Sequence, residues 1–259
     1  PTPEKQRNLA VAHLKLGDAL MDVDNYHDAL ENYQTSVSTF SELVSVDKDN
    51  ATRIRELCLG YSRIAIVYNR LEQYEKAAEF NLKAIEQQKR IAVADTQNVQ
   101  IFLDIATTYQ NLAGNYLELN KLDAALENNR QAIKIYTETL AKNPDNSQAQ
   151  GNFGGAYITL AEILTEKGDL TGALETYQKA LQILESESIR SSQMRSLAYT
   201  YQGIAEIYQK NKRFDEAKVW YQKSLAVWED LRKKGQITSE YSAKFDEIKE
   251  LIEKCERRN

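Results

Sequence analysis

The amino-acid sequence predicts an all-α fold, an α-solenoid of five helix-turn-helix repeats closed by a C-terminal capping helix. Two observations predict it. A short phrase centred on an alanine recurs five times along the 259 residues at nearly constant spacing. Glycine and proline, with 10 and 3 residues, are too scarce for the many turns of a β-sandwich or a barrel.

Small residues mark the repeat at three positions. Because two helices that cross closely exclude larger side chains, we expect these residues to lie at helix crossings. The central alanines are separated by 48, 48, 48 and 44 residues, another small residue lies twelve positions before each, and a third lies seven after. The three sets are Ala29, Ala77, Ala125, Ala173 and Ala217; Gly17, Ala65, Ala113, Ala161 and Ala205; and Ser36, Ala84, Ala132, Ala180 and Ser224.

Aromatic residues recur in the same register. One set is Tyr61, Tyr109, Tyr157 and Tyr201, with His13 in the first repeat; a later set is Tyr33, Tyr177 and Tyr221, with Asn81 and Asn129 in the second and third repeats. With the small residues, this pattern resembles the tetratricopeptide repeat family over essentially the whole chain. The resemblance implies a right-handed superhelix whose inner face is lined by the first helix of each repeat and binds a protein or a peptide.

The repeat is longer than the 34 residues typical of that family. The extra 14 residues add roughly 10 Å to each of two helices. A further small set precedes the others by seven residues, and an apolar residue comes directly before each member, so the crossing motif is extended by one heptad. The two sets are Ala10, Cys58, Ala106, Gly154 and Ala198; and Leu9, Leu57, Ile105, Phe153 and Leu197. Cys58 is therefore predicted to be a buried structural thiol. The long period resembles arrays appended to bacterial signalling proteins.

The elements follow in order from this register. One domain, 1–259, is predicted to hold repeats at about 3–46, 51–94, 98–142, 147–186 and 191–234 and a capping helix at about 238–256. Asn50, Asn98 and Asn146 are expected to cap helices at three of the joints. Four residues are lost at the fourth joint, around 186–188. The capping helix has one apolar stripe, Tyr241, Phe245, Ile248, Ile252 and Cys255.

Composition excludes several classes of function. The net charge of -5 argues against a nucleic-acid-binding protein. No run of about 18 apolar residues predicts a membrane helix. Two histidines and two cysteines match no metal or catalytic motif, so neither an enzyme nor a cofactor is expected. The chain begins without a methionine, so we expect an excised or processed domain; a targeting or membrane segment upstream stays open, as does bacterial origin, with the cytoplasm as the default compartment.

The resemblance also indicates where a partner binds. On the inner face the chain places basic residues near the second repeat and acidic residues near the last two, which favours a partner with an acidic and a basic segment. Asn69 and Asn111 are candidates to hold a peptide backbone. The alternative is that these charges are solvated or pair between adjacent helices. The candidate binding residues are Arg55, Arg63, Asn69, Arg70, Gln110, Asn111, Glu118, Thr159, Glu162, Glu166, Tyr199, Gln202 and Glu206.

The sequence argues against one known kind of partner but does not identify another. Some members of the family bind the carboxylate of heat-shock chaperones through a Lys-Asn-Asn-Lys-Arg clamp. The matching positions here are Ser62, Ile66, Asn111, Gly155 and Thr159, of which one fits. Such a partner is not expected. The sequence favours a non-catalytic scaffold for protein or peptide binding; the alternatives are a regulatory or sensing module of a larger signalling protein, such as a bacterial serine/threonine kinase, and a peptide-pheromone receptor.

Overall fold

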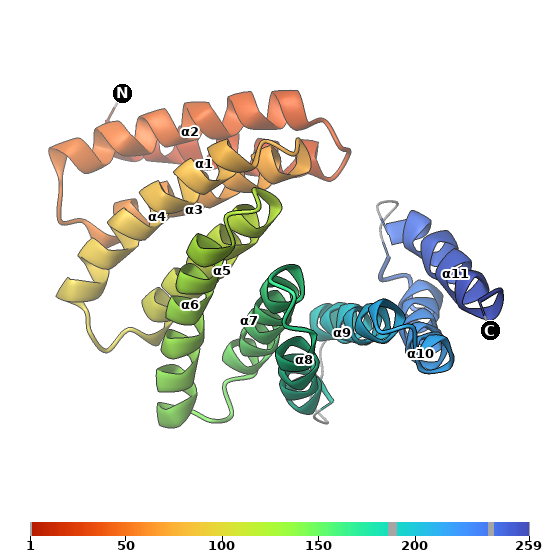
Figure 1. Ribbon diagram of the computed structural model, residues 1–259. Helices are drawn as coiled ribbons and strands as arrows, with labels where there is room; N and C mark the ends of the chain where they lie inside the picture. Colours follow the sequence, from red (N-terminus) through yellow and green to blue (C-terminus); the bar gives the residue numbers. More distant parts are fainter. Residues whose placement is uncertain (1, 186–190, 238–240, 259) are drawn as a thin grey trace. The chain divides into compact units, whose positions relative to one another are not determined.

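The computed structural model describes residues 2–185, 191–237 and 241–258, and within these ranges all regular structure is helical (Figure 1). This confirms the predicted all-α repeat fold with a capping helix. The helices are α1 (Pro3–Met21), α2 (Tyr26–Val46), α3 (Ala51–Arg70), α4 (Tyr74–Ala94), α5 (Val99–Glu118), α6 (Leu122–Lys142), α7 (Ser147–Glu166), α8 (Leu170–Leu184), α9 (Ser191–Lys210), α10 (Phe214–Lys233) and α11 (Ser242–Glu256).

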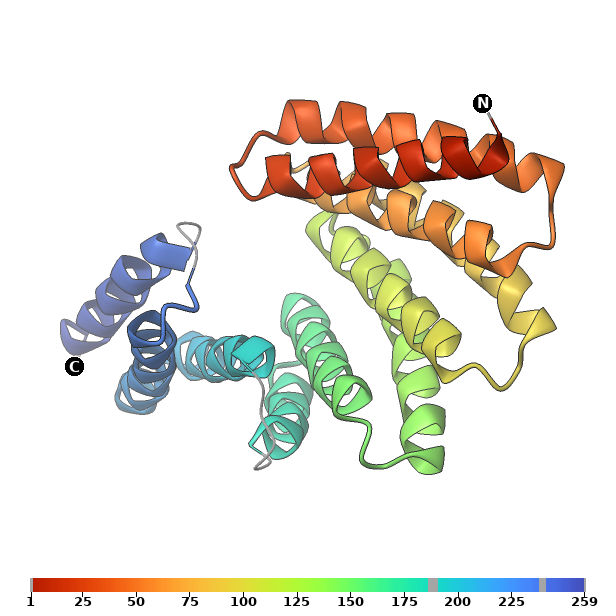
Figure 2. The ribbon, with the colours of Figure 1, turned by 180° about the vertical axis from the view of Figure 1, so that it is seen from behind.

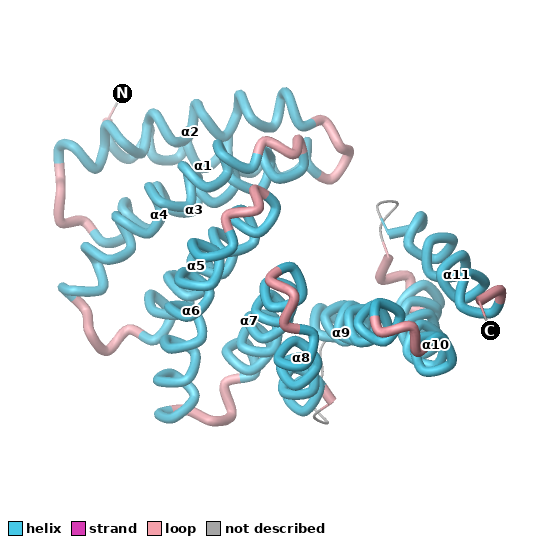
Figure 3. The backbone as a smooth tube through the Cα atoms, viewed as in Figure 1, coloured by secondary structure: helices cyan, strands magenta, loops and turns pink. Residues whose placement is uncertain are grey.

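Short turns join the two helices of each repeat, as Figure 3 shows. One residue in each turn has a positive φ, and the five occupy the same position of the repeat. Four are not glycine: Asp24 (58°), Glu72 (55°), Asn120 (53°) and Lys212 (61°); the fifth is Gly168 (83°). A left-handed residue after the last helical turn reverses the chain within a few residues, so the second helix returns along the first.

The joints between repeats agree with the predicted caps at two positions. The side-chain oxygens of Asn50 and Asn146 accept hydrogen bonds from the backbone N–H groups of Arg53 (3.2 Å) and Ala149 (2.9 Å). Asn98 occupies the same position before α5, but its side-chain oxygen makes no capping hydrogen bond; its amide donates to Asp95 (3.0 Å), as that of Asn50 donates to Asp47 (2.9 Å). Either arrangement closes the loop before a new repeat begins.

The central alanines lie in the interior, as predicted. Ala29, Ala77, Ala125, Ala173 and Ala217 are each 0% exposed. At two crossings the small residue is a glycine against a tyrosine ring. A Cβ on Gly17 would lie 2.5 Å from the ring of Tyr33, and one on Gly203 would lie 2.3 Å from that of Tyr177. Small side chains at these positions are therefore required by packing.

The chain divides into two compact units, Pro1–Ile135 and Tyr136–Asn259, which are described separately. In the first unit, α1 packs beside α2, α2 beside α3 and α3 beside α4 (Figure 2). Its core runs from Ala10 on α1 to Ile105 on α5. In the second unit, one cluster joins α7, α8 and α9, and another joins α9, α10 and α11.

The capping helix covers the second unit through the predicted stripe. Phe245 is 3% exposed, Ile248 0% and Cys255 0%. Tyr241, just before the helix, stacks on the buried Trp228 with ring centroids 5.3 Å apart. The predicted start at 238 lies outside the described residues. Among the helices described, none combines the length and apolar character needed to cross a membrane.

Candidate binding surface

The first helices of the repeats in the first unit (α1, α3 and α5) are joined by ion pairs. Arg63 on α3 lies 2.9 Å from Asp18 on α1, and Asp18 also accepts a hydrogen bond from the hydroxyl of Tyr33 (2.7 Å). Arg55 lies 3.7 Å from Asp104 on α5. The predicted arginines therefore share one face, but carboxylates of neighbouring helices offset their charge. For Arg55 and Arg63 this matches the alternative interpretation, pairs between adjacent helices.

Three asparagine side chains form a hydrogen-bonded row across α4, α5 and α3. The Asn81 amide donates to the side-chain oxygen of Asn115 (2.8 Å), and the Asn115 amide donates to that of Asn69. Asn81 is 1% exposed and Asn115 3%. Asn115, in the middle of the row, both donates and accepts, whereas the buried side-chain oxygen of Asn81 has no hydrogen-bond partner. The hydrogen bond from Asn115 thus fixes the orientation of the predicted residue Asn69, and the side-chain oxygen of Asn69 is already hydrogen-bonded within the protein.

Of the three asparagines in this row, only Asn69 was among the candidate binding residues predicted from the sequence. Asn81 occupies the position that holds a tyrosine in repeats one, four and five, and that substitution was the available signal. Asn115 occupies the position of Val67, Ile163 and Ile207, so a polar residue among apolar ones was a second available signal. Asn111, one helical turn before Asn115, is exposed, and so are Arg70 and Glu118, whereas Gln110 is half-buried. These predicted residues lie at the surface of α3 and α5.

In the second unit, two carboxylates act on one tyrosine hydroxyl. Glu162 on α7 and Glu206 on α9 both raise the pKa of Tyr177 on α8, although burial of that hydroxyl is the larger cause. The missing side chain of Gly203 admits the tyrosine ring between the helices. Partial burial also raises the pKa of Glu206 above its ordinary value. Acidic groups from two successive first helices therefore converge on one point.

Gln202 lies one turn before Glu206 and completes this group. Its amide donates to the Glu206 carboxylate (3.0 Å). The side chain is 8% exposed, and its carbonyl oxygen is buried without a hydrogen-bond partner. A buried acceptor left in this state costs about 1–3 kcal/mol. Glu162, Gln202 and Glu206 together are called the acidic site below.

The other predicted residues of the second unit make contacts away from the acidic site. Tyr199 packs edge-on against Trp228, with centroids 5.4 Å apart, so it belongs to the core beneath α11. The Thr159 hydroxyl donates to the carbonyl oxygen of Gly155 in its own helix (3.3 Å). Glu166 lies 3.9 Å from Lys210 on α9. Of the predicted set in this unit, the structure brings together only the acidic site.

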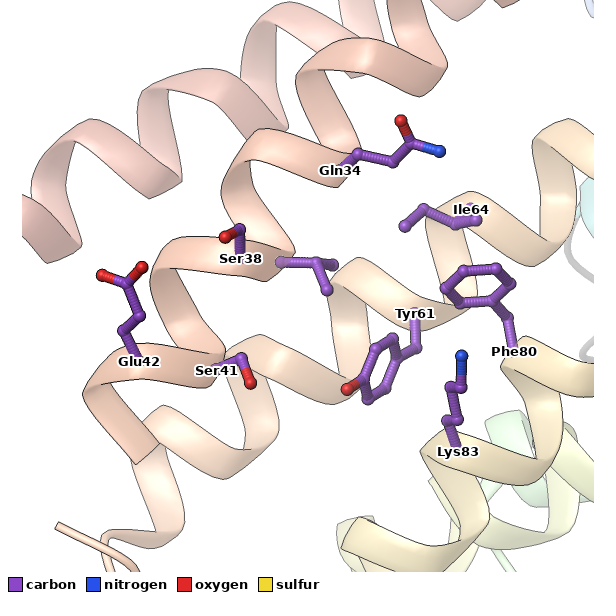
Figure 4. A pocket seen from close by; sticks show the side chains of 9 residues that line it. Gln34, Ser38, Ser41, Glu42, Tyr61, Ile64, Phe80 and Lys83 are labelled. Atoms are coloured by element: carbon purple, nitrogen blue, oxygen red, sulfur yellow. The ribbon is translucent and has the colours of Figure 1, made fainter. Parts of the chain in front are cut away.

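A pocket of about 380 Å³ lies between α2 and α4, with α3 as its floor (Figure 4). The rings of Tyr61 and Phe80 face it with centroids 5.9 Å apart, and the Lys83 ammonium lies 4.5 Å from the Phe80 centroid. None of the predicted binding residues lines it. Tyr61 packs against the core of the first unit and is half-buried, with one side facing the pocket.

Neither thiol is suited to covalent chemistry. Cys58 is 4% exposed and donates to the carbonyl oxygen of Ala84 (3.7 Å), and burial raises its pKa to about 12. Burial also raises the pKa of Cys255. Both therefore stay protonated at neutral pH. Over the part of the chain that the structure describes, no group of three or more His, Cys, Asp or Glu side chains is placed to hold a metal ion.

Helix pairs stacked in sequence, with alanines at each crossing, define an α-solenoid repeat protein. Comparison with known families identifies the repeat. Residues 105–145 and 152–230 match family descriptions that both read "Tetratricopeptide repeat". The chain belongs to the tetratricopeptide repeat family. A search of curated protein sequences finds no match.

Several solved structures share the fold at low sequence identity. The apo form of RapI has a TM-score of 0.66 at 15% identity, with 95% of this chain and 81% of RapI covered. A Rap protein complexed with competence and sporulation factor has a TM-score of 0.60 at 16% identity, with 95% of this chain and 63% of the Rap protein covered. BtubC from P. vanneervenii has a TM-score of 0.53 at 18% identity, with 90% and 93% covered. These likenesses concern the fold alone.

Proposed function

We propose that the chain is a non-catalytic scaffold that binds a protein or a peptide on the first helices of its repeats. The acidic site in the second unit receives a lysine or arginine side chain of that partner. In the first unit, the half-buried amide of Asn69 and the exposed amide of Asn111 offer hydrogen bonds to a peptide backbone. Membership of the tetratricopeptide repeat family supports the general function, since such repeats present extended binding surfaces.

The observation that carries the proposal is the unsatisfied carbonyl of Gln202 beside two carboxylates. A buried acceptor without a partner lies next to a carboxylate whose pKa is raised by burial, and Lys210 and Lys244 only partly oppose that shift, so a further cation would be favourable there. An ammonium or guanidinium group provides several N–H donors and a positive charge at once. It would satisfy the Gln202 oxygen and place a positive charge beside the Glu206 carboxylate.

The first unit contributes differently. Because Asp18 and Asp104 offset Arg63 and Arg55, this surface offers hydrogen bonds rather than a net positive charge. The buried row behind Asn69 fixes the orientation of its amide. A side chain held in advance loses less entropy when it binds a peptide bond. A segment bound there therefore needs an extended or irregular backbone.

The test is selection from a random peptide display library on the whole chain. We expect the selected peptides to be enriched in lysine and arginine. A Glu162→Gln, Glu206→Gln variant should bind them at least about tenfold more weakly, a loss of about 1.4 kcal/mol. Glu175→Gln removes one negative charge from an exposed position on α8 and serves as the control. Binders without basic residues, or equal affinity of the double variant, would contradict the proposal.

A second proposal is a regulatory or sensing module, either part of a larger signalling protein or a peptide-pheromone receptor. The observation that favours it is the likeness in fold to a Rap protein complexed with competence and sporulation factor. The sequence of the full-length gene product separates these alternatives. A kinase or DNA-binding domain in the same product would support them, and a product ending with the repeats would favour a free-standing scaffold.

A further inference from the structure

Both units contain a pair of aromatic rings with a lysine ammonium above them, at equivalent positions of the repeat. The ring centroids are 5.9 Å apart in the first unit and 5.7 Å apart in the second. The ammonium lies 4.5 Å and 4.0 Å from the centroid of the ring on the same helix. The members are Tyr61, Phe80 and Lys83 in the first unit and Tyr201, Trp220 and Lys223 in the second. The second unit therefore provides an internal reference for the first.

The two groups differ in what the second helix of the preceding repeat places beside the tyrosine. In the second unit, the carboxylate of Glu185 on α8 accepts a hydrogen bond from the Tyr201 hydroxyl (2.9 Å). The residue on α2 that is equivalent to Glu185 is Ser41. Among the residues that the structure describes, none forms a hydrogen bond with the Tyr61 hydroxyl. The first unit thus lacks the carboxylate that the second unit supplies from its own chain.

The pocket between α2 and α4 lies beside the side chains that are shorter in the first unit. Ser41 lines it, and so does Val37, one helical turn earlier (Figure 4). The residue equivalent to Val37 in the second unit is the larger Leu181, which packs against the core of that unit. The space of about 380 Å³ therefore suits a carboxylate and an apolar group from another molecule, in the positions of Glu185 and Leu181.

The charges around the pocket favour an anion at the tyrosine. Burial raises the pKa of the Tyr61 hydroxyl and the positive charge of Lys83 opposes this shift, so that charge acts at the hydroxyl. Lys83 is paired with Glu79 (2.6 Å), and 43% and 60% of the two side chains are exposed. An exposed pair of this kind contributes little and is readily exchanged for another carboxylate. Glu42, at the rim, opposes an anion, but its exposed charge is screened by solvent and salt.

We propose that this pocket binds an acidic segment of a partner protein. A glutamate or aspartate carboxylate of that segment accepts a hydrogen bond from the Tyr61 hydroxyl beside Lys83, in the position that Glu185 holds in the second unit. A neighbouring apolar side chain of the segment packs on Val37 and Phe80. The site lies on α2, α3 and α4 and takes the opposite charge from the acidic site, so it does not depend on the function proposed for that site.

Selection from a random peptide display library tests this on the whole chain carrying Glu162→Gln and Glu206→Gln, in which the acidic site no longer selects basic peptides. We expect the selected peptides to share an acidic residue close to an apolar one. Ser41→Glu should weaken their binding at least about tenfold, because it supplies the chain's own carboxylate at the site and repels that of the peptide. Lys83→Gln should weaken it as well. Lys223→Gln, the equivalent substitution in the second unit, is the matched control and should leave the affinity unchanged.

The charge at the rim gives a second test. Glu42→Gln removes a negative charge and should strengthen the binding of acidic peptides, whereas a site for cations would bind its ligand more weakly. Circular dichroism establishes that the variants remain folded. Selected peptides without an acidic residue overturn the proposal, as do acidic peptides whose affinity is indifferent to Ser41→Glu. Equal weakening by Lys83→Gln and Lys223→Gln also overturns it, because the attraction would then come from the overall charge and not from this pocket.

Discussion

A carboxylate that is partly buried between helices destabilises the fold when it is ionised, and Glu206 is such a group. Desolvation raises its pKa, and the hydrogen bond from Gln202 only partly opposes that shift. A carboxyl whose pKa is higher in the folded than in the unfolded state favours folding most below its ordinary pKa. That advantage is lost as the pH rises through the folded-state value.

Replacing Glu206 with glutamine should therefore stabilise the free protein at neutral pH. We expect Glu206→Gln to raise the melting temperature at pH 7. Near about pH 4 it should have little effect, because the Glu206 carboxyl of the folded protein is then mostly protonated and uncharged, like the glutamine. Thermal unfolding followed by circular dichroism at the two pH values measures this. Glu175→Gln, at an exposed position, should change neither. An unchanged melting temperature at pH 7 would mean that water solvates the carboxylate fully, and would remove a main support of the acidic site.

Single residues also mark the limit of what sequence could predict. The repeat register identified the residues on the first helices, but it carried no information about what lies across from each one. Tyr199 was predicted to bind a partner, but in the structure its ring packs against Trp228, which lies 29 positions later in the sequence. Asn69 was predicted from its amide chemistry, whereas the row that orients it depends on Asn115, which the sequence analysis did not single out. Pairings between repeats require the three-dimensional structure.

At the scale of the helices, one turn residue in every repeat adopts the left-handed conformation, and of these five only Gly168 is a glycine, which has no Cβ to oppose it. A Cβ there would meet no atom within 4 Å, so replacement by alanine changes the backbone energy alone. We expect Gly168→Ala to lower the free energy of unfolding by roughly 1 kcal/mol, because an L-residue with positive φ is strained.

The same chemical change within a helix should act in the opposite direction. Gly114 lies in the middle of α5, and a Cβ on it would also meet nothing within 4 Å. Gly114→Ala should raise the free energy of unfolding by up to about 1 kcal/mol, since glycine is a poor helix former. Urea denaturation of both variants gives the comparison. If both substitutions change the free energy of unfolding in the same direction, the positive φ of Gly168 does not strain an alanine at that position.

Helices were the scale at which the sequence predicted most. The start and end of α1 through α7 follow from the alanine register, the turn residues and the caps, because all three act within one or two turns of chain. The fourth joint, around 186–188, was expected to lose four residues and lies outside the described residues. The sequence could not predict which side chains of neighbouring helices contact each other, and so it did not predict the pocket beside Tyr61 and Phe80.

At the scale of the whole molecule, a stack in which each helix pair contacts mainly its sequence neighbours should unfold unevenly. Trp228 is 0% exposed and packs between Tyr199 and Tyr241, so it joins α9, α10 and the segment before α11. Trp228→Ala should cost about 3–5 kcal/mol locally. We expect faster amide hydrogen exchange in α9, α10 and α11 and unchanged exchange in α1 to α4, measured by mass spectrometry. Tyr33→Ala, in the core of the first unit, is the reciprocal variant and should give the reverse pattern. If either variant accelerates exchange evenly over all helices, the 259 residues unfold as one cooperative body and the two compact units have no separate stability.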